Sequence, residues 1–511
     1  MEFNIILKTA RSIVFELKDE SIYHTETLYE IYINDELIKT SNKIVESIYD
    51  LKPSTTYSLY VKNEDRASKP LEFTTEDEFV TLNVKDFGAQ GDGQKDDTAF
   101  IQAAILSCPK GGRVFIPKGT YKVTSLFLKS DLILEIGKDA LLSAFTERSK
   151  FPILPGIIES NDEKEEYNIG SWEGNPLDSF ASIITGINVS NVVICGEGTI
   201  DGQADFDNWW ERPKEKIGGA YRPRMIFLSH CTNIVVQGIT VQNSPAWNVH
   251  PYFSNNLRFI DLKILGPADS HNTDGLNPES CEDVEIVGNY FSVGDDCIAI
   301  KSGKIYMGRK YKVPSRNIRI RQCCMKDGHG AITLGSEIAA GVVDLKVENC
   351  LFLNTDRGLR VKTRRGRGKD SVLDQILFNN IYMNEVKAPF VVNSFYFCDP
   401  DGRTNYVSSE EPLPVDERTP EIKNLVFSNI ICENAHYCGA YIAGLPEQKI
   451  KSIKMDHVRI SYAPNAEKGQ AAMMLRCEPS AKLGIYISNV EDVVLNDVKV
   501  EGAIGEPIII E

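Results

Sequence analysis

The chain has 511 residues, with 56 Lys and Arg against 72 Asp and Glu, a formal net charge of -16 and 42% hydrophobic residues. This length and composition are typical of a globular chain that can bury a large core, and they exclude a disordered, collagen-like or coiled-coil protein. The acidic balance also argues against nucleic acid and anionic membrane as partners, because both repel a negatively charged surface at long range.

The first 76 residues predict a small β-sandwich, because short β-rich runs alternate there with turn signals. The run LKPSTTYSLYV, which starts at Leu51, resembles the tyrosine-corner strand of fibronectin type III domains, with Tyr57 as the corner residue. Nothing in this region suggests catalysis. We expect it to be a spacer or one wall of a cleft.

The N-terminal run MEFNIILKTARSIVFELKD contains only a short apolar patch and no small-residue cleavage site. No segment of the chain reaches the ~20 apolar residues of a membrane span. We therefore expect a cytoplasmic protein with no membrane partner. Twelve cysteines lack the spacing of metal ligands, which favours reduced core residues over a disulfide framework, and we expect neither a metal nor a cofactor.

Residues 77–511 predict one solenoid domain. DDTAFIQAAILSC predicts a short amphipathic helix near 98–108, with Asp96 or Asp97 as its N-cap, covering the first coil. Apolar strand starts then recur ten times at spacings of 23 to 49 residues, namely Val192, Ile234, Leu257, Val284, Ile318, Leu345, Ile376, Leu425, Ile453 and Val493. The shortest spacing is close to one coil of a parallel β-helix, and the longer ones indicate loop insertions.

The residues that precede these strand starts support the same fold. Eight of the ten are Asn or Asp, which tolerate the left-handed backbone of a tight bend between successive sheets. A doubly wound α/β fold would need intervening helices that the sequence does not predict. The predicted fold class is all-β, a parallel β-helix preceded by the β-sandwich.

Three neighbouring predicted coils carry polar residues that a core pattern does not explain. HNTDG supplies Asp274, GDDCIAIKSG supplies Asp295 and Asp296, and DGHG supplies His329. Residues one coil apart stack at about 4.8 Å, so these side chains are expected to form one stripe. DRGLRVKTRRGRGK then adds a basic strip made of Arg357, Arg360, Lys362, Arg364, Arg365, Arg367 and Lys369. A basic strip in an acidic chain predicts an anionic ligand, and the lack of interleaved aromatic residues argues against nucleic acid.

The strings NTDG, GDD, GHG and R-x-K, in this order, resemble the signature of the polygalacturonases, family 28 of the glycoside hydrolases. The resemblance covers most of residues 80–511, and RGLRVKTRRGRG with YFCDPDGRTNYVSSEEPLPVDERTP resembles the bacterial exo-acting branch. It implies a right-handed parallel β-helix that hydrolyses α-1,4-galacturonosyl bonds of polygalacturonate or oligogalacturonides with inversion. Loops around 150–180 and 396–418 are expected to block one end of the cleft, which favours exo action, and we expect release from the non-reducing end.

The resemblance also implies the catalytic roles. Asp295 corresponds to the general acid, Asp274 and Asp296 to the groups that activate water, and His329 to a neighbour that keeps Asp295 protonated. Chemistry supports a division of this kind independently of the family. Three close carboxylates cannot all ionise easily, so the pKa of one should rise and leave a proton on the cluster near neutral pH.

Substrate binding is expected to centre on Arg360 and Lys362, which the resemblance assigns to the carboxylate of the sugar at the cleavage point. A guanidinium fork matches a uronate carboxylate in charge and geometry, and a lysine adds a point charge. Further candidates on the same or earlier coils are Asn272, Arg357, Lys301, Arg222, Arg224 and His250.

Three other interpretations stay open at this point. A pectate lyase would require Ca²⁺ and would produce unsaturated ends. A non-catalytic pectin-binding β-helix would not depend on the aspartates for turnover. Within the hydrolases, a rhamnogalacturonan-directed galacturonidase is the nearest alternative. The sequence does not predict an oligomeric state.

Overall fold

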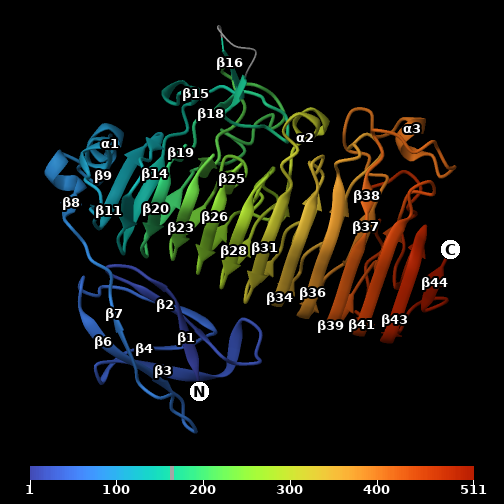
Figure 1. The fold of residues 1–511 in the computed structure, drawn as a ribbon, viewed down its shortest axis with the longest axis horizontal. Coiled ribbons are helices and arrows are strands. Elements are labelled where there is room, and N and C mark those ends of the chain that lie inside the picture. Colours follow the sequence, from blue (N-terminus) through green and yellow to red (C-terminus); the bar gives the residue numbers. More distant parts are fainter. Residues whose placement is uncertain (161–165) are drawn as a thin grey trace.

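The chain forms a small antiparallel sandwich followed by a long parallel β-helix in the computed structural model, which describes residues 1–160 and 166–511 (Figure 1). The sandwich has one sheet in the order β1-β2-β5 and a second in the order β4-β3-β6-β7. The hydroxyl of Tyr57 accepts a hydrogen bond from the backbone N–H of Lys52 at 2.9 Å, which is the contact that a tyrosine corner requires. The strands are β1 (Phe3–Lys8), β2 (Ile13–Leu17), β3 (His24–Ile33), β4 (Glu36–Lys43), β5 (Val45–Ile48), β6 (Thr56–Lys62) and β7 (Leu71–Thr74).

The sandwich packs against the outside of the β-helix. Ile260 and Val287 of the β-helix belong to the hydrophobic core of the sandwich. At the same interface Ser47 donates a hydrogen bond to Asp261 at 2.7 Å, and Arg321 pairs with Glu16 at 3.0 Å. These contacts fix the small domain on the side of the solenoid.

The longest column of the β-helix confirms the predicted repeat. The ten apolar strand starts are paired in one continuous row, from Val192 through Leu257 and Leu345 to Val493. In-register stacking places their side chains above one another inside the coil, where they form the core. The strands of this column are β8 (Thr81–Asn83), β10 (Arg113–Ile116), β13 (Leu132–Ile136), β20 (Ser190–Cys195), β23 (Thr232–Gln237), β26 (Asn255–Ile260), β28 (Glu282–Val287), β31 (Ser315–Arg321), β34 (Val342–Leu353), β36 (Val372–Asn384), β38 (Glu421–Ile422), β39 (Asn424–Ala435), β41 (Ile450–Tyr462) and β43 (Val490–Glu501).

Two further columns complete each coil. One is formed by β9 (Asp92–Asp96), β11 (Gly119–Val123), β14 (Ala140–Ala144), β21 (Thr199–Asp201), β24 (Thr240–Gln242), β27 (Lys263–Leu265), β29 (Tyr290–Ser292) and β32 (Cys324–Lys326), and it continues in the second halves of the long strands from β34 onward. The other is formed by β12 (Leu126–Phe127), β19 (Ile184–Ile187), β22 (Ile226–Ser229) and β25 (Val249–Tyr252), then by β30 (Ile298–Ile300), β33 (Ile332–Gly335), β35 (Arg357–Lys362), β37 (Ala388–Asn393), β40 (Cys438–Ala443), β42 (Leu483–Ser488) and β44 (Ile508–Ile510).

The predicted bends are left-handed in seven of the ten coils, from Asn191 at φ 57° to Gln375 at φ 57°. A second left-handed residue lies five positions later in all ten coils, from Gly196 to Asp497, and the last three coils keep only this second bend, at Asn429, His457 and Asp497. Asparagine side chains also stack between coils, and Asn233 donates to Asn191 at 2.8 Å. This ladder satisfies side-chain amides at the surface of the solenoid.

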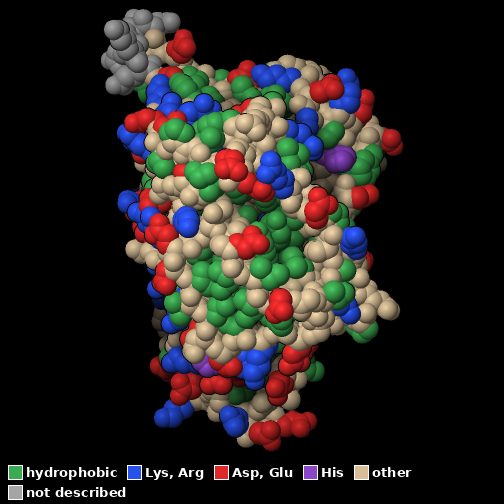
Figure 2. All heavy atoms as spheres, turned by 90° about the vertical axis from the view of Figure 1, so that its right-hand side faces the viewer, with side chains coloured by type: hydrophobic (Ala, Val, Ile, Leu, Met, Phe, Trp, Pro, Cys, Tyr) green, Lys and Arg blue, Asp and Glu red, His purple; other side chains and the backbone are tan. Residues whose placement is uncertain are grey.

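The two ends of the solenoid differ. Helix α1 (Thr98–Ser107) covers the N-terminal end and buries Ile101, Ala104 and Ile105, as its spacing predicts. Asp96 accepts from the backbone N–H of Thr98 at 3.0 Å, whereas the carboxylate of Asp97 serves the preceding turn. Figure 2 shows hydrophobic side chains gathered on the opposite, C-terminal end, where the last coil leaves its core residues partly buried, namely Val490, Val493, Leu495, Val498, Val500 and Ile508.

The loops between the strands of the three columns carry the remaining short elements (Figure 1). These are β15 (Ile153–Leu154), β16 (Ile157–Glu159), β17 (Glu166–Asn168), β18 (Ser179–Phe180), α2 (Ile305–Tyr311), α3 (Asn405–Ser408) and the 3-10 turns Val84–Phe87 and Arg148–Lys150. Residues 161–165 of the expected 150–180 loop lie outside the described residues. Within the described ranges, every cysteine is free and the helices are too short or too polar to cross a membrane.

Candidate active site

A pocket of about 240 Å³ opens beside the third column, around the residues that precede its strands. Bridges from Val249 to Leu276 and from Leu276 to Ile298 join β25 to β30 and make this column continuous. Eight of the twelve predicted site residues line the pocket, namely Asp274, Asp295, Asp296, His329, Asn272, Lys301, Arg360 and Lys362. Among the described residues, the lining comes entirely from the β-helix and its loops, so the sandwich is not a wall of this pocket.

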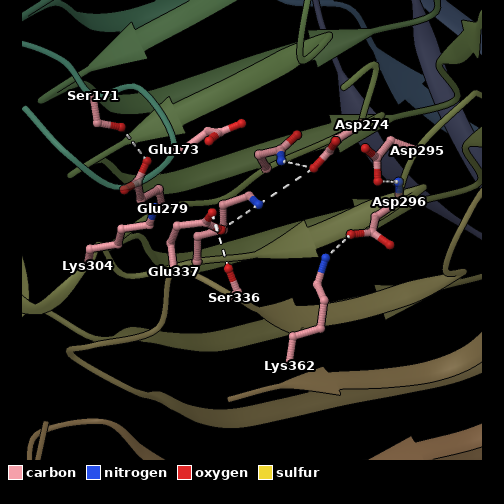
Figure 3. A network of polar contacts seen from close by, with 12 residues as sticks. Ser171, Glu173, Asp274, Glu279, Asp295, Asp296, Lys304, Ser336, Glu337 and Lys362 are labelled. Atoms are coloured by element: carbon pink, nitrogen blue, oxygen red, sulfur yellow. Dashed lines mark hydrogen bonds and ion pairs between the residues drawn. The ribbon is translucent and has the colours of Figure 1, made fainter. Parts of the chain in front are cut away.

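The three aspartates meet because of the register of the third column. Leu276 pairs with Ile298, which places Asp274 in the same row as Asp296 rather than Asp295. The backbone N–H of Gly275 donates to the carbonyl of Asp296 at 2.9 Å and fixes this row. Asp295 lies in the turn before β30, half-buried, and its carboxylate accepts from the N–H of Asp296 at 2.9 Å (Figure 3).

Asp296 is held as a carboxylate by two cations. Lys362 pairs with one of its oxygens at 2.7 Å and Arg360 with the other at 3.2 Å. Burial acts to raise the pKa of Asp296, but the charges of Lys362 and Arg360 outweigh it and hold that pKa well below its usual range. Asp296 therefore stays ionised across the physiological pH range.

Asp274 behaves in the opposite way. Burial, together with the charge of Asp295, raises the pKa of Asp274 to about 7. Its carboxyl accepts from Asn277 at 2.7 Å, and the ammonium of Lys301 lies 3.6 Å away. Below about pH 7 the aspartate cluster therefore holds a proton, as the sequence argument requires of three close carboxyl groups.

Lys301 links the aspartate cluster to Glu337, a carboxylate that was not predicted as a site residue from the sequence. Its ammonium pairs with Glu337 at 2.9 Å and lies 4.4 Å from the ring centre of Trp247. Burial acts to lower the pKa of Lys301, but Glu337 and Asp274 outweigh it and raise that pKa. Lys301 and Glu337 thus form a buried ion pair in the pocket wall.

His329 lies exposed at the edge of the pocket. Its Nδ1 is 2.9 Å from a carboxylate oxygen of Asp356, and this hydrogen bond raises the pKa of His329. The backbone N–H of His329 donates to the carbonyl of Asp295 at 3.1 Å, which ties the histidine to the acidic turn. The imidazole of His329 can therefore change the local charge beside Asp295 when it gains or loses a proton.

Arg357 and Arg222 are placed elsewhere, with their guanidinium groups on backbone carbonyls. Arg357 donates to the carbonyls of Gln470 at 2.8 Å and Ala471 at 3.2 Å. Arg222 donates to the carbonyls of Pro245 and His271, at 2.6 and 2.8 Å. Arg222 also donates a 2.8 Å hydrogen bond to the side chain of Asn272, which positions a residue that does line the pocket.

Arg224 and His250 are buried beneath the segment 168–175. Arg224 donates to the carbonyl of Ser171, and Nε2 of His250 lies 2.8 Å from Glu279. Burial lowers the pKa of His250 to about 4, so its imidazole is neutral at pH 7. These residues hold a loop in place and do not face the pocket.

Other residues of the pocket could not be predicted from the repeat pattern of the sequence. They lie in insertions or just outside strands, where neither coil spacing nor alternation applies, and they include Glu173, Lys214, Trp247, Lys304, Tyr396 and Asp399. Glu337 follows β33 at the end of the run DGHGAITLGSE. Only its closeness in sequence to His329 could have suggested it as a site residue. Throughout the described ranges, no group of three or more His, Cys, Asp and Glu side chains is arranged to hold a metal ion.

The fold and the site define a parallel β-helix protein with paired carboxylates and cations in one pocket, and comparison with known proteins identifies the family. Residues 141–477 match glycosyl hydrolases family 28, and residues 81–138 match Rhamnogalacturonase A/epimerase, pectate lyase-like. A probable polygalacturonase of Vitis vinifera is 31% identical over 395 residues, 76% of each chain. The chain belongs to glycoside hydrolase family 28, the pectin-degrading polygalacturonase family.

Solved structures extend the likeness to the whole architecture. The family 28 exopolygalacturonase of Yersinia enterocolitica superposes with a TM-score of 0.72 at 20% identity, covering 100% of this chain and 97% of that one. A hyperthermoactive exopolygalacturonase of Thermotoga maritima gives a TM-score of 0.62 at 25% identity, covering 81% and 91%. The fold class predicted from sequence is confirmed by these likenesses.

Proposed function

We propose that this protein hydrolyses α-1,4-galacturonosyl bonds of polygalacturonate or oligogalacturonides and removes units from the non-reducing end. The observation that carries the proposal is the pocket in which three aspartates meet Arg360 and Lys362. Asp296 gives these two cations only one negative charge, and a uronate carboxylate can supply the second, which a neutral sugar cannot.

The aspartates divide the chemistry. Asp295, at the pocket surface, is the proposed general acid that protonates the glycosidic oxygen. Asp296 and Asp274 are the proposed groups that orient and deprotonate the attacking water on the other face of the sugar, which gives inversion. Below about pH 7 the aspartate cluster holds a proton, and coupled carboxyl groups share such a proton, so we propose that it is delivered through Asp295, which leaves Asp274 ionised as a base.

Cation pairing with Asp296 prepares the site for an anionic sugar. Arg360 and Lys362 are already held on the carboxylate, so little side-chain freedom is lost when a substrate carboxylate arrives. His329 is charged over a wider pH range because of Asp356, so we propose that it stabilises the carboxylate of Asp295 after the proton has been donated, in place of the predicted role of keeping Asp295 protonated.

Exo action rests on how the pocket is closed. The backbone N–H of Lys304 donates to the carbonyl of Gly174 at 2.9 Å, and its ammonium pairs with Asp399 at 3.1 Å. Lys304 thus joins the two segments, 150–180 and 396–418, that the sequence argument expected to block one end. Closure of the pocket at Lys304, on the side opposite Asp295 (Figure 3), favours trimming from a chain terminus over cutting in its middle.

The test is an early time course of polygalacturonate digestion with EDTA present, with products resolved by size and examined for ultraviolet absorbance. We expect saturated mono- or digalacturonate alone. A ladder of mixed sizes would overturn exo action and keep the hydrolase. Unsaturated products that appear only with calcium would indicate a lyase, and binding without turnover a carbohydrate-binding β-helix.

Gly174 offers a direct test of the closed end. Its φ is +74°, and an added Cβ would lie 2.7 Å from Cγ of Glu337 and 2.9 Å from the nitrogen of Lys304. We expect Gly174→Ala to displace the closing loop and to lengthen the first products. Gly502→Ala is the matched control, because Gly502 is also left-handed but has open space around it.

A rhamnogalacturonan-directed activity is the second candidate, favoured by the family match over residues 81–138. Residues 81–138 contribute none of the described pocket residues. The match over this stretch therefore supports the fold more than it supports a particular substrate. Assaying rhamnogalacturonan beside polygalacturonate at equal galacturonate content decides between them.

A further inference from the structure

We propose that Lys304 binds the carboxylate of the terminal galacturonate at the closed end of the pocket, as a second uronate contact beside the one at Arg360 and Lys362. The inference rests on the proposed function and deepens it, since it names the part of the substrate that the closed end recognises.

The charge around Lys304 is not balanced. Asp399 accepts three cations at once, Lys304 at 3.1 Å, Arg364 at 3.1 Å and Arg367 at 2.6 Å. Arg364 also pairs with Asp401 at 2.7 Å. Three cations therefore share two carboxylates in this cluster, which leaves one positive charge without a full partner.

The neighbouring carboxylates of the pocket do not cancel that charge. Glu337 pairs with Lys301 at 2.9 Å, and Asp296 is shared by Arg360 and Lys362. Glu173, the acidic residue of the closing loop, pairs with Lys214. Asp274 and Asp295, the remaining carboxyl groups of the pocket, lie on its other side (Figure 3), so the surplus positive charge is local to the cluster around Asp399.

Lys304 is the member of the cluster that faces the pocket. It lines the cavity together with Asp399, whereas Arg364 and Arg367 lie behind Asp399 and are not lining residues. In Figure 3 Lys304 and Asp295 lie at opposite sides of the network, with Glu337 between them. An anion bound at Lys304 would therefore sit on the far side of the pocket from the proposed acid.

The position of Lys304 is fixed before any substrate binds. Its backbone N–H is bound to Gly174, and its carbonyl accepts from Gly308 at 2.9 Å in the first turn of α2. Asp399 holds the ammonium from behind, and the side chain remains partly exposed. A pre-positioned, partly desolvated ammonium binds a carboxylate more strongly than a mobile surface lysine.

A purely structural role is the rival explanation, in which Lys304 only anchors the 396–418 loop. Arg364 and Arg367 already hold Asp399 in that loop, and Arg365 holds it further along through the carbonyl of Ser409 at 2.7 Å. The loop thus has three arginine anchors without Lys304. A structural role also predicts no dependence on the charge of the substrate.

The experiment compares two substrates and four proteins. The substrates are trigalacturonate and its analogue whose non-reducing terminal carboxylate alone is reduced to the alcohol. The proteins are the unaltered chain, Lys304→Met, Lys304→Arg and the control Lys454→Met, which removes an exposed lysine of the outer strand β41. Values of kcat and KM are measured for each pair, and thermal unfolding shows that each variant is folded.

We expect the unaltered chain and Lys454→Met to lose about 10- to 100-fold in kcat/KM on the reduced substrate, chiefly through KM. Lys304→Met should show a similar loss on trigalacturonate and no further loss on the reduced analogue. Lys304→Arg should recover most of the discrimination.

Undiminished discrimination by a folded Lys304→Met would overturn the inference and leave the proposed function intact. Absence of hydrolysis by the unaltered chain on both substrates and on polygalacturonate would overturn the proposed function, and this inference with it. A Lys304→Met protein that loses the same factor on both substrates would assign Lys304 to anchoring the loop.

Discussion

Two polar clusters on neighbouring coils of the third column can be compared directly. Around Asp296, a buried carboxylate meets Arg360 and Lys362 at the floor of the pocket. Around Glu279, a buried carboxylate meets His250 and Ser171, each at 2.8 Å, and no side of the cluster lines the pocket. Both combine acidic and basic side chains on the same face of the solenoid.

The difference lies in what covers each cluster. The segment 168–172 lies over the second one, because Ser229 donates to the carbonyl of Ile169 at 2.5 Å and Ser171 donates to Glu279. Its buried polar atoms fix the loop, as buried hydrogen-bonded groups commonly do. The first cluster lacks such a cover and remains open to a ligand. The inserted segment 168–172, and not the types of residue, therefore makes the difference between the open cluster around Asp296 and the covered cluster around Glu279.

The largest effect is expected from Asp295→Asn, which should reduce kcat by at least about 10²-fold while oligogalacturonate still binds. Only proton donation is removed, because the amide keeps the size of the side chain and its acceptor toward the N–H of Asp296. Single-turnover kinetics and calorimetric binding measure the two parts. Unchanged turnover would remove Asp295 from the catalytic role.

Arg360→Ala is expected to raise KM about 10- to 100-fold on oligogalacturonate. It removes one of the two cations on Asp296, so the pKa of that carboxyl should rise as well. Steady-state kinetics on charged and esterified substrates separates these effects. Equal kinetic constants for variant and unaltered chain would place Arg360 outside the site.

The pH dependence follows from the proton on the aspartate cluster. Because the pKa of Asp274 is raised to about 7, the cluster loses its proton as the pH increases through 7, and kcat/KM should fall about tenfold per unit beyond it. A pH profile of the unaltered chain measures this limb. Constant activity up to pH 9 would show that the proton is not needed.

The same shift makes a prediction about stability. A carboxyl whose folded pKa lies above its unfolded value stabilises the fold below the unfolded pKa and loses that contribution as the pH rises toward 7. Asp274→Asn should therefore raise the melting temperature by a few degrees at pH 8 and change it little at pH 4. Calorimetry at both values is the measurement, and a lower melting temperature at pH 8 would contradict it.

The smallest effect is expected from Arg357→Met, which tests whether a buried arginine bound to backbone carbonyls stabilises the fold without binding substrate. Its guanidinium donates to the carbonyls of Gln470 and Ala471 and makes a weaker 3.5 Å contact with Asp356, so we expect about 1 to 3 kcal/mol of lost stability and kcat/KM within about threefold. Chemical unfolding and kinetics measure the two quantities. A rise in KM comparable to that of Arg360→Ala would return Arg357 to the binding site.

Some features of this protein could be predicted from the chain alone. The row from Val192 to Val493 could be predicted from the apolar strand starts. Successive coils stack in register, so the first apolar residue of each strand lies directly above that of the coil before it. The left-handed bends follow from Asn and Asp at a fixed position, although the last three coils lack this bend and keep only the second one, five residues later. The three aspartates follow from short motifs on consecutive coils.

Tertiary structure decided which charged residues are open to a ligand. Lys304, Glu337 and Asp399 belong to turns and insertions without a repeat length, so no spacing rule could place them in the pocket. Arg224 and His250 satisfy the spacing rule but are covered by the 168–175 segment. A repeating backbone fixes where a side chain starts, whereas burial and charge pairing depend on loops that come from distant parts of the sequence.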